Sequence, residues 1–381
     1  MTKPLVVLGA TGSIGIQTLE VADNLGLEVA VLAARRPSEE LADIASRHPD
    51  ADVVVAGGSY DERDRFDRTL GRASLHGSEA VIEAASRPGV VVVNGIVGSA
   101  GLRATVAALE AGNRVALANK ESLVAGGPVV AAALVEHGGE LIPVDSEHSA
   151  LYQCLEGEPR EAVSRLILTA SGGPFRGRSK ESLASVTPEE ALRHPTWDMG
   201  RRITIDSATM FNKGLEIIEA HHLFGVEYDR IEIVVHPQSI LHSAVEFVDG
   251  SWKGHLGYPD MRIPIQYSLT APERAATPGE PFDPVGTDLT FEAPDREVFA
   301  AIDIAYEAGR AGGSAPAVMN AADEIAVEAF LQRRLGFLGI ADVVARTLEA
   351  IAWREVDTVE DVVEVDAEAR SVAAGLVAGV C

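Results

Sequence analysis

The stretch Leu5-Val6-Val7-Leu8-Gly9-Ala10-Thr11-Gly12-Ser13-Ile14-Gly15 decides the fold of the first third of the chain. Its first four residues are apolar and predict a buried strand, and residues 16–24 have the pattern of a helix. Glycines at this spacing permit a tight turn and a close approach of the backbone to a ligand, and a helix N-terminus offers free N–H groups to a pyrophosphate. The stretch therefore indicates a nucleotide-binding strand–turn–helix, with a purely structural turn as the alternative.

Further apolar runs, separated in several places by helix-like segments, follow this first strand. Strands that alternate with helices pack as a parallel sheet. We therefore expect an α/β fold, with a Rossmann-like, doubly wound parallel sheet over residues 1–144. The strand-like runs are Leu5–Leu8, Val29–Leu32, Val53–Val55, Val90–Val93 and Val115–Leu117.

The pattern changes after this region. Residues 145–270 mix strand-like pieces with motif-rich loops and predict a central α+β catalytic domain. Within it, residues 171–201 are rich in Gly, Pro and Ser and predict a flexible loop over a site, with an ordinary surface loop as the alternative. Residues 271–297 hold five prolines and predict a linker, and residues 298–381 predict a small helical domain. Its expected helices are Ala300–Ala311, Ala317–Arg334, Ile340–Ile351 and Ala367–Val377.

Composition narrows the classes of function. The 381 residues are 46% hydrophobic and 23% charged, which excludes wholesale disorder. The net charge of −25 argues against nucleic-acid binding, which needs a surplus of Lys and Arg. Cys154 and Cys381 are too few for a disulfide framework, and the longest apolar stretch, 124–135, is shorter than the ~20 residues of a membrane span. With no export signal at the N-terminus, we expect a cytoplasmic protein.

The end of the second predicted strand helps to identify the nucleotide. A protein that binds the ribose 2′-hydroxyl of NAD usually has Asp or Glu there, whereas this chain has Ala34-Arg35-Arg36. Guanidinium groups pair well with a 2′-phosphate, so this pattern favours NADP(H). The alternative is that Arg35 or Arg36 is a solvated surface charge.

An acidic segment, Asp145-Ser146-Glu147, follows a later apolar strand. On an extended segment, residues two apart face the same way, so Asp145 and Glu147 would present two carboxylates to one ion. Oxygen donors of this kind suit Mg²⁺ or Mn²⁺ rather than zinc. The alternative is a solvated acidic pair, or one that caps a helix.

Two further segments carry dense polar chemistry. Residues 206–216 place Asn212 and Lys213 as donors to a phosphate and Glu216 as a third metal ligand. The alternative is a helix start capped by Ser207 or Asp206. In residues 194–200, a histidine and a tryptophan lie within the predicted flexible loop, where the indole ring covers either a ligand or the protein itself.

Together these segments resemble the 1-deoxy-D-xylulose 5-phosphate reductoisomerase family along essentially the whole chain. Eight motifs in the same order make the resemblance specific. They are Gly9–Gly15, Ala118–Ser122, Val144–Ser149, Ala170–Phe175, His194–Gly200, Asp206–Glu216, His236–Ser239 with His242–Ser243, and Gly257–Pro264.

The resemblance implies a set of site residues. The implied metal ligands are Asp145, Glu147 and Glu216, and the implied phosphate cradle is Ser171, Ser207, Asn212 and Lys213. The implied contacts to the rest of the substrate are Lys120, Ser146 and His194, with Trp197 and Met199 on the closing loop. The implied nucleotide contacts are Thr11, Gly12, Ser13, Ile14, Asn119, Glu121 and Gly200. The chain departs from many relatives at Ala34-Arg35-Arg36, where they carry a glycine, a basic or small residue and then an asparagine.

The resemblance also implies an activity. A divalent ion, Mg²⁺ or Mn²⁺, would act as the Lewis acid in rearranging 1-deoxy-D-xylulose 5-phosphate. NADPH would then reduce the resulting aldehyde to 2-C-methyl-D-erythritol 4-phosphate, an isoprenoid precursor. The resemblance implies a homodimer and leaves open both ketol migration and retro-aldol/aldol steps. The alternatives are an NADP-dependent dehydrogenase of the homoserine or semialdehyde type, and a non-catalytic NADP-binding sensor.

Overall fold

The structure, a computed structural model, describes residues 3–197 and 199–380. Asp198, which falls within the predicted flexible loop, and Cys381, one of the two cysteines, lie outside the described residues. The chain divides into two compact units, each described by itself. The first comprises Met1–Ser122, Val130–Ser149 and Asp260–Glu280, and the second comprises Leu123–Val129, Ala150–Pro259 and Pro281–Cys381. The domain boundaries predicted after residues 144, 270 and 297 stay predictions.

The first unit contains a seven-stranded parallel sheet in the order β4-β3-β2-β1-β5-β6-β7. The strand order reverses between β1 and β5, which makes the carboxyl ends of these strands a topological switch point. Strands β1 and β5 are buried along their whole length, as expected for a sheet covered on both faces. The Rossmann-like prediction is confirmed. The strands are β1 Leu5–Leu8, β2 Val29–Ala34, β3 Asp52–Val55, β4 Leu75–His76, β5 Val91–Asn94, β6 Arg114–Leu117 and β7 Glu140–Pro143.

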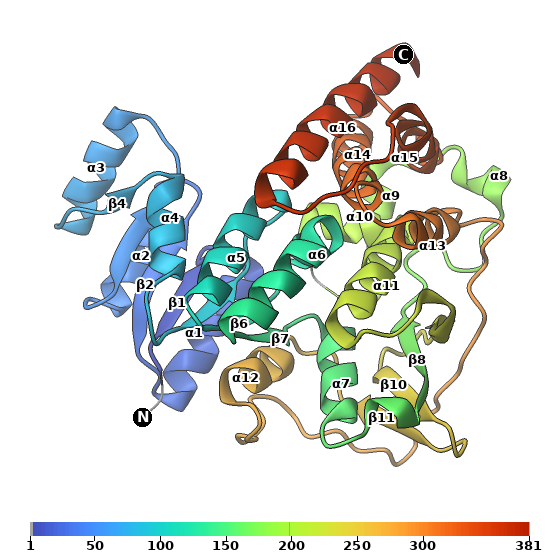
Figure 1. Ribbon diagram of the computed structural model, residues 1–381, viewed down its shortest axis with the longest axis horizontal. Coiled ribbons are helices and arrows are strands. Elements are labelled where there is room, and N and C mark those ends of the chain that lie inside the picture. Colours follow the sequence, from blue (N-terminus) through green and yellow to red (C-terminus); the bar gives the residue numbers. More distant parts are fainter. Residues whose placement is uncertain (1–2, 198, 381) are drawn as a thin grey trace. The chain divides into compact units, whose positions relative to one another are not determined.

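Helices connect these strands. They are α1 Ser13–Leu25, α2 Glu39–Arg47, α3 Tyr60–Leu70, α4 Ser78–Ala85, α5 Leu102–Glu110 and α6 Lys120–His137. Helix α12, Arg262–Thr270, comes from much later in the chain and belongs to the same unit. Helix α4 packs against α5, and α1 packs against α12 (Figure 1). The apolar stretch 124–135 lies inside α6, which is kinked at Gly126 and contains Pro128. No helix in residues 3–197 and 199–380 is long and apolar enough to cross a bilayer.

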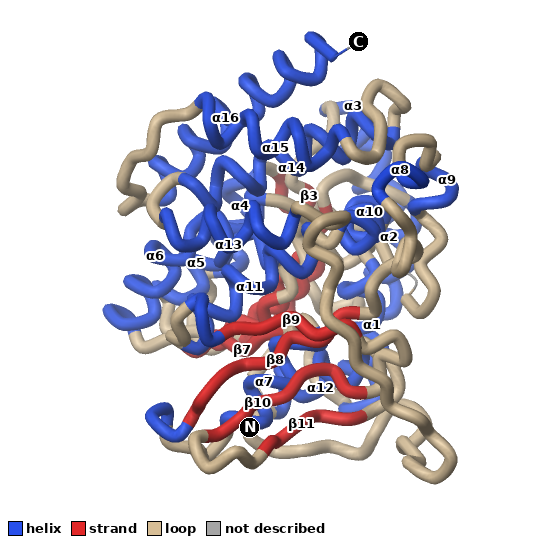
Figure 2. Tube along the Cα trace, turned by 90° about the vertical axis from the view of Figure 1, so that its right-hand side faces the viewer, coloured by secondary structure: helices blue, strands red, loops and turns tan. Residues whose placement is uncertain are grey.

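The second unit is built on a four-stranded mixed sheet in the order β11-β10-β8-β9, visible in Figure 2. Its strands are β8 Val163–Ala170, β9 Ile231–Val235, β10 Leu241–Phe247 and β11 Trp252–Leu256. Its helices are α7 Ser146–Leu155, of which the first turn belongs to the first unit, then α8 Lys180–Leu183, α9 Pro188–Ala191, α10 Arg201–Thr209, α11 Phe211–Phe224, α13 Ala301–Ala311, α14 Ala315–Leu331, α15 Gly339–Ala350 and α16 Val359–Val380. Helix α11 packs on β8 and β9, and α14 packs against α15 and α16.

The helical C-terminal region is confirmed, with shifts in the bounds of its helices. Helix α14 begins two residues earlier than expected, with Pro316 in its first turn, where a missing N–H is tolerated. Helix α16 is longer than the predicted Ala367–Val377. Residues 271–297, all of them described, form no regular element beyond a single bridge between Val235 and Glu292.

The predicted flexible loop, residues 171–201, is not exposed throughout. It contains α8 and α9, and Phe175, Leu183 and Ala191 lie in the hydrophobic core of the second unit. These buried side chains anchor its first two thirds. Any closing motion is therefore expected in the remaining part, which carries His194 and Trp197.

Candidate functional site

The glycine turn after β1 requires its glycines. Gly9 has a φ of +84°, and a Cβ at this position would lie 2.6 Å from the carbonyl oxygen of Gly95. A Cβ at Gly15 would lie 2.3 Å from the carbonyl oxygen of Gly9. Helix α1 begins at Ser13, and its N-cap, Gly12, has no side-chain capping bond. The turn therefore places the open N-terminus of α1, with Thr11 and Ile14, at the switch point, where doubly wound folds bind nucleotides.

Arg35 and Arg36 follow the last residue of β2, and both are exposed. Strand β2 neighbours β1 in the sheet, so its carboxyl end lies at the same edge as the glycine turn. Exposure leaves the guanidinium groups accessible to a 2′-phosphate. A binding measurement separates this role from the alternative of solvated surface charges.

We expect the double substitution Arg35→Asp/Arg36→Asp to weaken NADPH binding roughly tenfold or more while changing NADH binding much less, because only NADPH carries the 2′-phosphate. Fluorescence titration with each nucleotide measures the ratio. Equal losses for both nucleotides would show that the two arginines do not select the cofactor. Arg47→Asp on α2 is a control for the change in charge.

Asn119 and Glu121 hold the loop that follows β5. The Asn119 amide donates to the carbonyl oxygens of Ile96 and Gly98 at 2.8 and 2.9 Å and to Glu121 Oε2 at 2.8 Å. Glu121 Oε1 accepts from the backbone N–H of Gly98 at 3.1 Å. These two predicted nucleotide contacts therefore shape the loop beside the switch point.

Three buried polar residues that the sequence analysis did not single out complete this network. Asn94 Nδ2 donates to Thr105 Oγ1 at 2.8 Å, and Thr105 Oγ1 lies 3.2 Å from Ser122 Oγ. The Ser122 hydroxyl in turn donates to the side-chain oxygen of Asn119. Ser122 is the last residue of the matched motif at 118–122, which was the available sequence signal.

The acidic segment after β7 differs from the prediction in one respect. A helix, α7, begins at Ser146, so Asp145 and Glu147 do not share an extended segment and the alternation argument for pairing them is wrong. Asp145 instead stands at the helix start, where its Oδ1 accepts from the backbone N–H of Ser146 at 3.0 Å. Glu147 lies in the first turn, where its carboxylate accepts from the Ser146 hydroxyl at 2.5 Å.

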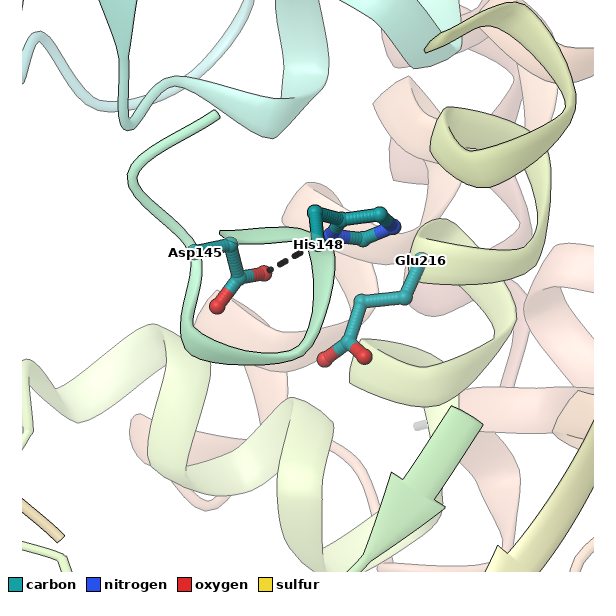
Figure 3. A group of neighbouring side chains, drawn as sticks. All are labelled: Asp145, His148 and Glu216. Carbon is teal, nitrogen blue, oxygen red and sulfur yellow. Dashed lines mark ion pairs between the residues drawn. The ribbon is translucent and has the colours of Figure 1, made fainter. Parts of the chain in front are cut away.

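Two basic groups face Asp145. Lys120 Nζ lies 2.7 Å from Asp145 Oδ2. His148 Nδ1 lies 3.7 Å from the same oxygen, and a dashed line marks this ion pair in Figure 3. Burial alone would raise the pKa of Asp145, but the Lys120 ammonium and the His148 imidazole outweigh it and hold the pKa well below its usual range. The carboxylate is therefore kept ionised. His148 was missed from the sequence, although it lies one helical turn after Asp145.

In the second unit, Glu216 on α11 is fully buried, and its side chain is drawn in Figure 3. Its Oε1 accepts from Asn212 Nδ2 at 2.7 Å, and its Oε2 lies 2.5 Å from Lys213 Nζ. The spacing of three and four residues on one helix brings the three side chains together. The alternative of a helix capped by Ser207 or Asp206 is wrong, because both residues lie near the end of α10 and α11 begins after Met210.

The side chain of Ser171 contacts His194, and Ser207 lies beside the turn that holds Ser171. His194 Nδ1 accepts from the backbone N–H groups of Thr196 and Trp197 at 3.1 and 2.9 Å, so a neutral ring carries its proton on Nε2. That proton points to Ser171 Oγ at 3.0 Å, and the N–H of Gly173 donates to the same oxygen at 3.2 Å.

With two donors on its oxygen, the Ser171 hydroxyl keeps its own hydrogen for a ligand. A Cβ at Gly173 would lie 2.8 Å from the carbonyl oxygen of Ser207. The Ser171–Gly173 turn and the end of α10 therefore lie in contact.

The remaining loop residues are placed as follows. Trp197 is half-buried, and its ring lies 6.4 Å from that of His242, so part of it packs on the protein. Met199 is half-buried, and Gly200 is the exposed N-cap of α10.

The donor set fits a hard divalent cation. Asp145, Glu147 and Glu216 offer carboxylate oxygens, the donors that Mg²⁺ and Mn²⁺ prefer, and the first is held ionised. Lys120 groups with Asp145 in one unit, and Asn212 and Lys213 group with Glu216 in the other. In the first unit, the glycine turn offers N–H groups to a dinucleotide, and Asp145 and Glu147 offer carboxylates to a cation. In the second unit, Asn212 and Lys213 offer donors to an anion.

Three family models match the chain. Residues 5–127 match the model described as 1-deoxy-D-xylulose 5-phosphate reductoisomerase. Residues 141–224 match its C-terminal domain, and residues 256–372 match the DXP reductoisomerase C-terminal domain. The matches span both compact units.

Individual relatives agree with these matches. The 1-deoxy-D-xylulose 5-phosphate reductoisomerase of Heliobacterium modesticaldum is 49% identical over 97% of this chain and 96% of its own length. The enzyme of Zymomonas mobilis is 48% identical over 99% of this chain and 98% of its own length. A solved structure from Zymomonas mobilis in complex with NADPH has a TM-score of 0.92 at 46% identity and covers 99% of each chain. A DOX-P reductoisomerase structure in complex with NADPH, fosmidomycin and magnesium has a TM-score of 0.91 at 37% identity, over 99% of this chain and 98% of that one.

Proposed function

The chain belongs to the 1-deoxy-D-xylulose 5-phosphate reductoisomerase family, and from this membership we propose its reaction. It converts 1-deoxy-D-xylulose 5-phosphate to 2-C-methyl-D-erythritol 4-phosphate with NADPH and Mg²⁺ or Mn²⁺, in the non-mevalonate route to isoprenoid precursors. The observation that carries this proposal is the pairing of buried lysines with the proposed metal ligands, Lys120 with Asp145 and Lys213 with Glu216. A simple dehydrogenase needs neither pair.

The proposed metal ligands are Asp145, Glu147 and Glu216. When bound, the ion polarises the ketone and the adjacent hydroxyl of the substrate, and NADPH supplies the hydride. Lys120, beside Asp145, is placed to stabilise negative charge on the substrate backbone, and Ser146 and His194 offer hydrogen bonds to it.

The proposed phosphate cradle uses Ser171, Ser207, Asn212 and Lys213. One ammonium, one amide and two hydroxyls hold a dianion by short charge-assisted bonds, which act within a few ångströms even though the protein carries a net charge of −25. Ser171 contributes the hydroxyl hydrogen that His194 leaves available. Trp197 and Met199 cover the substrate and exclude water, which keeps a reactive aldehyde from escaping.

The nucleotide site takes Thr11, Gly12, Ser13 and Ile14 from the glycine turn, with Arg35, Arg36, Asn119, Glu121 and Gly200. We place the protein in the cytoplasm, where the buried thiol of Cys154 stays reduced.

We also propose a homodimer. Strand β11 forms an edge of its sheet and exposes Trp252 and Leu256 at 51% and 43%, and an apolar sheet edge favours pairing with a second copy. A monomer mass from sedimentation equilibrium would contradict it.

The test of the reaction is NADPH absorbance with purified protein and 1-deoxy-D-xylulose 5-phosphate. We expect substrate-dependent NADPH loss that disappears on chelation and returns with Mg²⁺ or Mn²⁺. Turnover that survives chelation would favour the dehydrogenase alternative. NADPH binding without turnover under either metal would favour the sensor.

A further inference from the structure

A buried charge cluster in the second unit takes no part in the reaction proposed above. Its centre is Arg202 on α10, whose side chain is 17% exposed. The guanidinium lies 3.5 Å from Asp206, 3.6 Å from Asp323 and 2.9 Å from Glu324, and it donates to Asn320 Oδ1 at 3.0 Å. Because the last three residues belong to α14, one cation joins α10 to the C-terminal helices.

The cluster contains a pair of carboxyl groups. The side chains of Asp206 and Asp323 are 4% and 0% exposed, and both face the Arg202 guanidinium. Two buried carboxylates beside one guanidinium repel each other when both are ionised, which favours a proton on one of them. Burial and the neighbouring Asp206 raise the pKa of Asp323 well above its usual range.

This pair adjoins the proposed phosphate cradle. Asp206 directly precedes Ser207, whose carbonyl oxygen lies against Gly173. The Thr209 hydroxyl donates to the carbonyl oxygen of Ile205 at 3.0 Å and accepts from the N–H of Phe211 at 3.4 Å, which fixes the corner into α11. The last turn of α10, which holds Asp206, thus sets the position of Ser207. The corner that follows it sets the position of Asn212 and Lys213 at the start of α11.

We propose that Asp323 is a positioning residue for the phosphate cradle: with Asp206 and Arg202 it ties the last turn of α10, and therefore Ser207, to α14. The inference rests on the proposed function, because it assigns the C-terminal helices a part in substrate affinity. Asp323 acts through Asp206 and Arg202, and we assign it no contact with the substrate.

The groups around the pair make this tie sensitive to pH. Arg202 faces it from α10 and Glu324 from α14, and Arg370 on α16 lies 2.7 Å from Glu324 and 2.6 Å from Asp366. Arg202 already faces three carboxylates, so ionising the second member of the pair adds repulsion between α10 and α14. Substrate affinity is therefore expected to fall as the pH rises through the pKa of Asp323.

Kinetics of three variants test the proposal. Asp323→Ala is expected to raise KM for 1-deoxy-D-xylulose 5-phosphate roughly tenfold, with kcat and the NADPH affinity within about twofold of wild type, because only the cradle is displaced. Asp323→Asn preserves the shape but cannot ionise. It is expected to keep the wild-type KM at a pH below the pKa of Asp323 and to lack the rise in KM with pH. Asp366→Asn, which removes a carboxylate that contacts Arg370 on α16, is the matched control and is expected to retain the rise in KM with pH.

The pH dependence of folding stability gives an independent test of the direction of the Asp323 pKa shift. Since the folded state binds the Asp323 proton more tightly than the unfolded state, wild-type stability falls as the pH rises from 3.8 through the folded pKa, and Asp323→Asn escapes this loss. A wild-type KM in Asp323→Ala, or a rise in KM with pH that persists in Asp323→Asn, would overturn the proposal. If Asp323→Ala does not fold, the pH profile of Asp323→Asn decides.

Calorimetric titration with inorganic phosphate makes the same comparison without turnover. Phosphate binding that weakens in wild type as the pH rises, and does not weaken in Asp323→Asn, supports the positioning role even if the proposed reaction fails. If wild type and Asp323→Asn bind phosphate with equal affinity at every pH, the positioning role is wrong even if turnover is observed.

Discussion

Glu216→Gln is expected to lose metal-dependent turnover by roughly 10²- to 10³-fold, the size that follows removal of one electrostatic group from a buried reacting site. Glu216 is fully buried, and its two oxygens face Asn212 and Lys213. Glutamine keeps the shape and can still accept from Asn212. It removes the negative charge that a divalent ion requires and turns an N–H group toward either Lys213 or Asn212, both of which are donors.

The measurement is NADPH oxidation as a function of Mg²⁺ and Mn²⁺ concentration, together with a fluorescence titration of NADPH. The NADPH affinity should stay near that of wild type, because the proposed nucleotide contacts of the glycine turn belong to the other unit. Glu227→Gln, an exposed position three residues after α11, is the matched control. Full turnover in Glu216→Gln would remove this residue from the metal site, and a parallel loss of NADPH binding would point to a folding defect.

The second large effect is expected for Lys213→Met, which should raise KM for 1-deoxy-D-xylulose 5-phosphate roughly 100-fold. Lys213 is 4% exposed, so its ammonium contributes in a site with little solvent screening. Methionine keeps most of the aliphatic chain and removes the charge. Lys180→Met on α8, at an exposed position, controls for the loss of one lysine.

A substrate without phosphate separates two causes for this effect. Lys213 also contacts Glu216, so its removal could act through that carboxylate as well as through the cradle. Wild type and Lys213→Met should turn over 1-deoxy-D-xylulose at similar low rates if Lys213 acts on the phosphate. An equal loss for both substrates would assign Lys213 to the support of Glu216 instead.

The nucleotide half of the site could be read from the sequence because its constraints are local. Gly9 and Gly15 leave no room for a side chain, and strand and helix follow each other within a few residues. The same holds for Asn212, Lys213 and Glu216, whose spacing brings them together on any helix. That an amide, an ammonium and a carboxylate come together within residues 206–216 could therefore be predicted without knowledge of the tertiary structure.

The start of α7 could not be read in the same way. Residues 145–149 are compatible with a strand end and with a helix start, and the choice depends on the first turn. In the structure the carbonyl oxygen of Asp145 accepts from the N–H of Ser149 at 2.8 Å, which closes that turn. The cluster around Arg202 left no local signal at all, because Asp206 and Asp323 come from distant parts of the chain.

The return of the chain to the first unit has a consequence for synthesis on the ribosome. Ile265 and Leu269 of α12 belong to the same hydrophobic core as Leu5 and Val93, and Arg114 donates to the carbonyl oxygen of Ala271 at 2.8 Å. The nucleotide-binding unit therefore cannot complete its core until more than two thirds of the polypeptide has been made. A truncated protein that stops after β7 would expose the apolar surface that α12 covers, and such a fragment is an aggregating species rather than an independent NADPH-binding module.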